Sequence, residues 1–268
     1  MQNFNYHTHT YRCGHSDQSI SDEEYVIMFL KKGFKKIAFT DHCPYIKQLD
    51  FRYNMRMDYS QKEEYYESIR KLKEKYKDKI DIEVGFEFEY APNQKDYLKI
   101  IKSETNKMVM GQHVISDDNG ENVKVIGWRD NTDEDLYRYA ELVEEAMREG
   151  IPDVVVHPDC YMLSKSSFGK VEAEVAHSIC KAAEKYQVPL EINLTRIAML
   201  LDGRTNDIKY PCKEFWKIAS NYDVKVIYGV DAHFRFQLDF YEESVKYCED
   251  YLGKDVISNL HFCEEDLK

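Results

Sequence analysis

The sequence predicts an α/β fold in which a parallel sheet closes, or nearly closes, into a barrel. Apolar strand segments alternate with amphipathic helices along the 268 residues, and almost every strand segment ends in His, Asp or Glu. Alternating units of this kind form parallel sheets with right-handed crossovers. A closed sheet brings all the strand ends to one mouth, whereas an open sheet would scatter them along an edge. The placement of the polar residues therefore favours the barrel.

Short apolar runs indicate seven strands. They are expected in a run that begins at Phe4 and ends in two histidines, and then at 36–40, 82–86, 108–111, 153–156, 189–193 and 225–230.

Capping patterns and apolar periodicity indicate the helices between the strands. Ser21 with Glu24, and Ser60 with Glu63, are capping-box pairs. Helices are expected from Ser21 to Gly33, from Ser60 through Tyr76, across Tyr97 to Ile101, from Thr132 to Gly150, over Val175 to Tyr186, around Phe215 to Ile218, and through Tyr241 to Tyr251. Long loops are expected from Ile115 to Asn131 and, after residue 193, over a segment that carries Arg196 and Arg204.

The strand ends carry a set of metal-ligand residue types. His7 and His9 are two residues apart on a strand, so their side chains leave the same face and can bind one ion. The whole candidate set is His7, His9, His15, His42, Glu87, His113, His157, Asp231 and His233. Imidazole with carboxylate suits Zn, Mn or Fe better than Mg or Ca. Nine ligands are too many for one tetrahedral ion, but they suffice for three ions if a carboxylate and solvent bridge them.

Composition excludes several classes of function. A net charge of −12 gives no basic surface for nucleic acid and argues against an anionic membrane. No apolar run is long enough to span a membrane, and no signal peptide is evident. Seven cysteines without a Cys-x-x-Cys pair fit reduced thiols that serve as packing residues. We therefore expect a cytoplasmic protein with one domain over residues 1–268.

The order of these motifs resembles the polymerase and histidinol phosphatase (PHP) superfamily. His-x-His, a later His, Asp-His, Glu, His, His-Pro-Asp and Asp-Ala-His follow one another along almost the whole chain. Arg56-Met57 and the segments 72–76 and 82–87 are similar to the stand-alone histidinol-phosphate phosphatases of that superfamily, as are Glu191-Ile192-Asn193 and Tyr210-Pro211.

The resemblance implies a distorted (β/α)7 barrel with three divalent transition-metal ions, for which Zn is preferred over Mn or Fe. It implies that His7, His9, Glu87 and Asp231 hold one ion, that Glu87, His113 and His157 hold a second, and that His15, His42 and His233 hold the third. The implied reaction is hydrolysis of L-histidinol phosphate, a small-molecule substrate, to L-histidinol and phosphate in histidine biosynthesis.

A mechanism follows as a hypothesis. Hydroxide that bridges two ions attacks phosphorus, and the metals neutralise the phosphoryl oxygens. The expected catalytic residues are Asp231, as the acid and base, with Glu87 and His233.

Cationic side chains supply candidates for binding the substrate phosphate. Arg196 could bind the phosphate through two hydrogen bonds from its guanidinium group. Weaker candidates are Arg52, Arg56, Lys165 and Arg204. Trp128 or Asp159 could face the imidazole and ammonium of the substrate. The resemblance is weakest in these loops. After Glu-Ile-Asn the family usually has a small turn similar to Thr-Ser-Gly, whereas this chain has Leu194-Thr195-Arg196. After Tyr-Pro the family often has Ser, whereas this chain has Cys212.

Two alternatives stay open from the sequence. One is a related phosphoesterase that acts on a nucleotide or on phosphotyrosine, and the other is a non-catalytic metal-binding domain. The sequence does not indicate the oligomeric state.

Overall fold

Eight parallel strands form one curled sheet at the centre of the molecule. The computed structural model describes residues 2–45, 55–127 and 131–263. The strands follow the order β1-β2-β3-β4-β7-β8-β9-β10, and every neighbouring pair is parallel. Their bounds are β1 Phe4–Asn5, β2 Lys36–His42, β3 Asp81–Phe88, β4 Lys107–Met110, β7 Val154–Val155, β8 Leu190–Asn193, β9 Lys225–Gly229 and β10 His261–Phe262.

The first strand and β9 meet along an irregular seam. Thr8 and Ala232 form an isolated parallel bridge, in which the His9 amide donates to the Ala232 carbonyl at 3.0 Å. Side chains replace the rest of the ladder: Gln2 bonds both to the Tyr228 amide and to its carbonyl, and Asn5 Oδ1 accepts from the Val230 amide. The curled sheet is therefore joined across its ends, close to both His-x-His and Asp-Ala-His.

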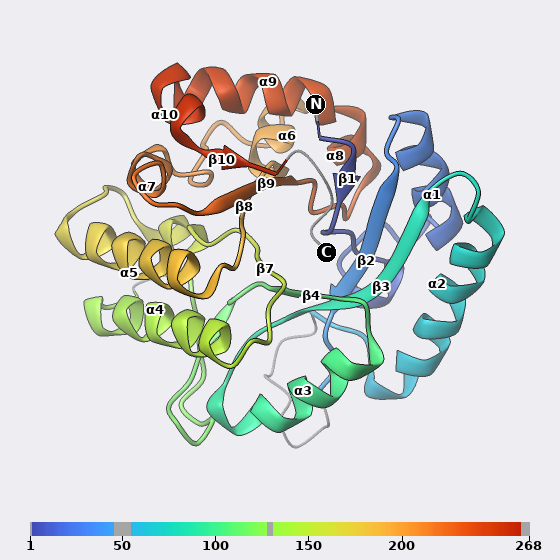
Figure 1. Ribbon diagram of the computed structural model, residues 1–268, viewed down its shortest axis with the longest axis horizontal. Coiled ribbons are helices and arrows are strands. Elements are labelled where there is room, and N and C mark those ends of the chain that lie inside the picture. The colour runs from blue at the N-terminus through green and yellow to red at the C-terminus, as the bar shows by residue number, and fades with distance from the viewer. Residues whose placement is uncertain (1, 46–54, 128–130, 264–268) are drawn as a thin grey trace.

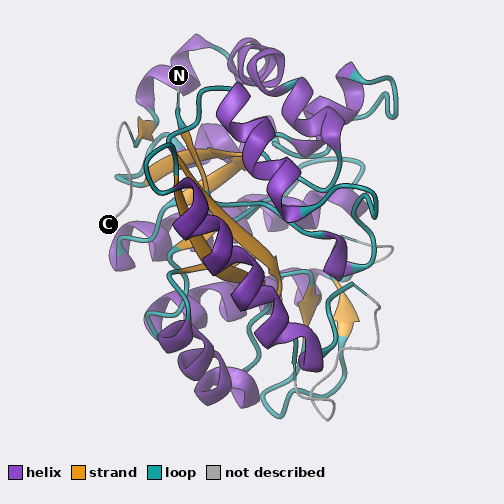
Figure 2. Ribbon diagram, turned by 90° about the vertical axis from the view of Figure 1, so that its right-hand side faces the viewer, coloured by secondary structure: helices purple, strands orange, loops and turns teal. Residues whose placement is uncertain are grey.

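Helices surround the strands (Figure 1), and the side view shows the strands enclosed by them (Figure 2). Their bounds are α1 Asp22–Lys31, α2 Lys62–Tyr76, α3 Lys95–Glu104, α4 Asp133–Arg148, α5 Lys170–Tyr186, α6 Thr195–Leu201, α7 Lys213–Ala219, α8 Arg235–Asp239, α9 Tyr241–Leu252 and α10 Lys254–Asn259. Among the described residues, no helix has the length and apolar character needed to cross a membrane.

The core has two parts. A large apolar cluster lies between the sheet and the helices. A smaller one contains side chains from five strands or their ends, and consists of Phe4, Tyr6, Ala38, Val109, Val154, Val156 and Ile227. In the register of the sheet, Ala38 lies beside Glu83, and Val109 lies beside Glu87. We therefore assign the smaller cluster to the inner face, where it lies beneath the polar residues of β3.

The parallel α/β architecture is confirmed, with additions. All seven predicted strands are present, and β10 is an eighth that the sequence did not reveal. The loop expected from Ile115 contains part of a short antiparallel pair, β5 Val114–Ile115 with β6 Lys124–Val125.

Two predictions about helix starts have different outcomes. The Ser21 capping box is present as expected. The Ser60 capping box is wrong, because a 3₁₀ turn over Tyr59–Gln61 (η3) precedes α2, and it is the Asp58 amide that donates to Gln61.

Candidate metal centre

All nine predicted ligand residues come together at the C-terminal ends of the strands. His7 and His9 follow β1, and His15 follows the 3₁₀ turn Tyr11–Cys13 (η1). His42 ends β2, Glu87 lies near the end of β3, His113 follows β4, His157 follows β7, and Asp231 and His233 follow β9. The parallel sheet thus collects in space residues that are far apart in the sequence.

Glu87 lies at the centre of the cluster and is 1% exposed. Its Oε1 lies 2.9 Å from His157 Nε2 and 3.5 Å from His113 Nε2. Its Oε2 lies 3.0 Å from His42 Nδ1 and 3.4 Å from His9 Nε2. The two oxygens therefore face different groups of histidines, as a bridging carboxylate would.

Asp231 gathers a second group. Its Oδ1 lies 3.1 Å from His233 Nδ1, 3.3 Å from His9 Nε2 and 3.4 Å from His7 Nε2. Asp231 has a φ of +50° and His157 a φ of +33°. Non-glycine residues in this region cost about 1–3 kcal/mol each and are typical of functional sites.

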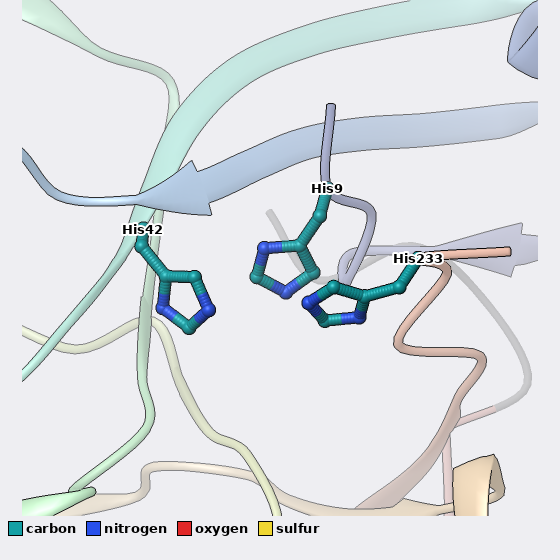
Figure 3. Close-up of side chains that lie close together, drawn as sticks. All are labelled: His9, His42 and His233. Atoms are coloured by element: carbon teal, nitrogen blue, oxygen red, sulfur yellow. The ribbon is translucent and has the colours of Figure 1, made fainter. Parts of the chain in front are cut away.

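Three imidazoles form a third group (Figure 3). The ring centroid of His9 lies 3.9 Å from that of His233 and 4.5 Å from that of His42. His15 is exposed at the edge of this group, with its ring 4.6 Å from His233. The Cys13 sulfur is also close enough to His15 and His233 to share an ion with them.

The polar atoms of the cluster fit metal ions. Buried atoms without a hydrogen-bond partner include His7 Nε2, both ring nitrogens of His9 and of His42, Glu87 Oε2, Asp231 Oδ1 and His233 Nε2. Buried polar atoms are costly unless something satisfies them. Groups such as His9, His42 and His233 have ligand atoms within 4.8 Å of one another. The site can therefore hold divalent metal, for which these donor types are suited.

Both carboxylates are held in the ionised form that ligation needs. Burial raises the pKa of Glu87, but His42, His113 and His7 outweigh it and bring that pKa well below its ordinary value. Burial also raises the pKa of Asp231, and His7 and His233 likewise bring it well below the usual range.

Further carboxylates lie behind three of the histidines. Glu191 Oε2 lies 3.0 Å from His7 Nδ1, and Asp41 Oδ1 lies 3.5 Å from His9 Nδ1. Glu89 Oε1 lies 3.1 Å from His113 Nδ1. Asp41 is thus placed to orient a histidine. The roles of Glu191 and Glu89 were not predicted from the sequence. The period of two in Glu87-x-Glu89 could have revealed Glu89, because β3 extends to Phe88 rather than ending at residue 86.

Gln237 on α8 fixes the segment that carries Asp231 and His233. Its Oε1 accepts from the amides of His233 at 2.7 Å and Phe234 at 2.6 Å, and its Nε2 donates to the Asp231 carbonyl at 2.8 Å. The same Nε2 lies 3.1 Å from Thr195 Oγ1. No sequence motif pointed to this residue.

Two glycines leave space for the carboxylates. A Cβ on Gly111 would lie 1.8 Å from Glu87 Oε1, and one on Gly229 would lie 2.0 Å from Glu191 Oε2. Neither position tolerates a side chain without moving a carboxylate of the cluster.

Three of the cations predicted to bind phosphate have protein partners in the described part of the chain. Arg196 lies in α6, not in the expected loop, and its Nη2 donates to the Asp207 carbonyl at 3.0 Å. Lys165 Nζ donates to the Asn131 carbonyl at 3.0 Å. Arg56 pairs with Glu89 at 2.9 Å. Arg52 lies outside the described residues.

The residues suggested for the substrate imidazole and ammonium have different outcomes. Asp159 is fully buried, and its Oδ2 accepts from the Cys212 amide at 2.6 Å and from Trp216 Nε1 at 3.1 Å. Burial raises its pKa to about 6. Asp159 therefore connects the segment that follows β7 with helix α7. Trp128 lies outside the described residues.

Comparisons with known proteins agree with this geometry. A family model of the PHP domain matches residues 5–195. A protein from Deinococcus radiodurans, named a probable histidinol-phosphatase, is 24% identical over 259 residues, which cover 93% of this chain and 94% of that protein.

Two crystal structures share the fold. A candidate histidinol phosphatase, HisK, from Listeria monocytogenes superposes with a TM-score of 0.70 at 20% identity, over 87% of this chain and 96% of that one. A histidinol phosphate phosphatase from Lactococcus lactis, complexed with zinc, L-histidinol and phosphate, superposes with a TM-score of 0.65 at 17% identity, over 97% of this chain and 95% of that one.

Proposed function

The chain belongs to the PHP domain family, and on that premise we propose that it is a metal-dependent phosphomonoesterase that hydrolyses L-histidinol phosphate to L-histidinol and phosphate. The observation that carries the proposal is the convergence of seven histidines with Glu87 and Asp231 at one end of the sheet. The similarity to histidinol phosphatases over almost the whole chain supports the choice of substrate.

The proposed centre holds three ions, most simply zinc. His7, His9, Glu87 and Asp231 would hold the first, and Glu87, His113 and His157 the second. The third would be held by His15, His42 and His233. The two sides of Glu87 support a bridge between the first and second ions, because one oxygen faces His157 and the other faces His9. Ions at this position would generate a nucleophile from water at neutral pH and neutralise the phosphoryl oxygens.

The chain's own residues would position the reactants and move a proton. Asp231 Oδ1 lies close to His7, His9 and His233, and this position supports a role for Asp231 in accepting a proton from the attacking water. Glu87 and His233 would hold the geometry in which that transfer occurs.

Arg196 is the favoured phosphate ligand. Its Nε is buried without a partner. Burial raises the pKa of the Tyr210 hydroxyl, Asp231 raises it further and Arg196 lowers it, so the guanidinium acts electrostatically close to the centre. Arg56, Arg52 and Lys165 are secondary candidates, and in the described structure Arg56 and Lys165 already bond to protein groups.

The remaining parts of the proposal concern context. One catalytic domain would span residues 1–268 as a distorted (β/α)7 barrel, closed at the Thr8–Ala232 bridge, with β10 as an added edge strand. No nucleic acid or membrane partner is proposed. A cytoplasmic location fits the seven cysteines, all of which are free thiols.

Phosphate release tests the proposal. Purified protein would be assayed with L-histidinol phosphate, AMP, phosphotyrosine and a simple aryl phosphate, each with and without chelator. We expect a strong, chelator-sensitive preference for L-histidinol phosphate. Preference for another ester would reject the substrate but keep a phosphoesterase centre. A metal-loaded protein with no turnover on any ester would favour a non-catalytic metal-binding domain.

A further inference from the structure

His113 lies between two carboxylates. Its Nε2 faces Glu87 Oε1 at 3.5 Å, and its Nδ1 faces Glu89 Oε1 at 3.1 Å. When a carboxylate accepts the Nδ1 hydrogen of an imidazole, Nε2 keeps its lone pair for a metal. The geometry at Glu89 therefore selects the tautomer of His113 that can act as a ligand at Nε2.

His113 needs such a partner more than the histidines deeper in the site. Its side chain is 22% exposed, whereas the side chain of His7 is fully buried. It also lies on the short segment between β4 and β5. Packing alone therefore fixes its ring less firmly than it fixes the ring of His7.

Glu89 is itself firmly held. It is 1% exposed, and Arg56 Nη1 lies 2.9 Å from its Oε2 while Arg56 Nη2 lies 3.4 Å from its Oε1. Arg56 Nη1 also donates to the Cys43 carbonyl at 3.1 Å. The Tyr45 hydroxyl donates to the Glu89 carbonyl and accepts from the Glu89 amide at 3.1 Å. Both the carboxylate and the backbone of Glu89 are thus fixed relative to His113.

We propose that Glu89 is a positioning residue for His113, fixed in place by Arg56, and that it directs His113 Nε2 toward the metal centre. This inference rests on the metal-ligand role of His113 in the proposed function, but it does not depend on the identity of the substrate. It also gives Arg56 a role other than binding phosphate.

The test compares zinc affinity among variants, measured by competition with a chromophoric chelator. Removing the partner of a metal-binding histidine costs about 10- to 100-fold in metal affinity. We expect that loss at one ion for Glu89→Ala and a smaller loss for Glu89→Gln, because the amide oxygen can still accept from Nδ1. Arg56→Met should weaken the affinity in the same direction.

Glu83→Gln is the matched control. Glu83 lies on β3, which Glu89 directly follows, and its position an even number of residues before Glu89 predicts that it faces the same side. It pairs with Lys36 at 2.9 Å, but it lies toward the other end of β3. We expect this variant to lose stability and to keep zinc affinity. If Glu83→Gln lowers zinc affinity as much as Glu89→Gln does, the effect is merely structural and the inference is wrong.

A second readout is the ¹⁵N NMR signature of the His113 ring. Wild-type protein should show hydrogen on Nδ1, and Glu89→Ala should lose that preference. If wild type binds zinc and Glu89→Ala keeps both its zinc affinity and the His113 tautomer, the inference is wrong but the proposed function stands. Wild type that binds no zinc would overturn the proposed function as well. Unchanged zinc affinity with a raised KM in Arg56→Met would overturn the role given to Arg56.

Discussion

The two ends of the inner face of the curled sheet both contain charged side chains, but the charges are partnered differently. At the N-terminal end, Glu83 lies between Lys36 at 2.9 Å and Lys107 at 3.7 Å, and Lys107 also lies over the Tyr6 ring. At the C-terminal end, Glu87 is surrounded by imidazoles, and several buried polar atoms have no hydrogen-bond partner. One strand, β3, supplies both carboxylates. At the first end two lysines of the chain balance the charge of Glu83, although its Oε2 makes no hydrogen bond. The second end collects many more such atoms and is arranged for something that the chain does not itself provide.

Glu87→Gln should have the largest effect on activity. The amide would lose the charge that faces two groups of histidines, so we expect phosphate release to fall about 1,000-fold, as when a central electrostatic contact of an active site is removed. Turnover of the purified variant, with zinc content measured in parallel, checks this. Glu83→Gln should keep near wild-type turnover, and equal losses in both variants would contradict the contrast between the two ends.

Gly111→Ala should reduce metal binding. The new Cβ would lie 1.8 Å from Glu87 Oε1 and 2.9 Å from His113 Cε1, so the carboxylate must move. We expect about a 10- to 100-fold loss of zinc affinity, measured by chelator competition.

Gly85→Ala provides the comparison for that variant. Its Cβ would meet the Lys107 carbonyl at 1.6 Å, which is backbone rather than a ligand. We expect about 1–3 kcal/mol of destabilisation in denaturant unfolding, because backbone must shift. A greater loss of zinc affinity in Gly85→Ala than in Gly111→Ala would reverse the assignment of these two glycines.

Glu83→Gln should lower stability without removing the centre. Both lysines would lose a charged partner in a largely buried setting, so we expect about 1–3 kcal/mol of destabilisation. Urea unfolding of the metal-free proteins measures this. An unchanged urea midpoint would show that the ion pairs of Glu83 with Lys36 and Lys107 contribute less to stability than their distances suggest.

Glu64→Gln should have the smallest effect, because the ion pair of Glu64 with Arg12 lies outside both the Glu83 cluster and the Glu87 cluster. Arg12 Nε donates to Glu64 at 2.8 Å, and this hydrogen bond lowers the pKa of Glu64. A carboxylate with a lowered folded-state pKa stabilises the protein above its unfolded-state pKa, and it loses that stabilisation as the pH falls through the folded-state value. Since Glu64 is 58% exposed, we expect less than about 1 kcal/mol at pH 7. The difference between variant and wild type in urea unfolding should shrink below about pH 4, and a difference that grows there would be contrary to this.

The sequence revealed the parts of the site that follow local rules. His7 and His9 could be predicted as a pair from strand alternation, and His157, Asp231 and His233 from their positions after apolar runs. Glu89 was missed because β3 was ended too early, although the alternation that places Glu87 also places Glu89.

Other features depend on contacts that one sequence does not display. Gln237 is defined by its hydrogen bonds to backbone groups of a neighbouring turn and to the Thr195 hydroxyl. The positive φ of Asp231 occurs in a residue type that does not require it. Arg196 was assigned to a loop because the short helix α6 follows directly after β8. Tertiary packing, rather than local propensity, decided each of these features.

The seam between Thr8 and Ala232 has a consequence for folding. It places His7 and His9 beside Asp231 and His233, which come from opposite ends of the chain. An ion shared by these residues would cross-link the chain into a loop of nearly its full length. Closing such a long loop removes much conformational entropy from the unfolded chain. Metal bound at the seam would therefore stabilise the whole fold against unfolding, in the way that a disulfide between the two ends of the chain would.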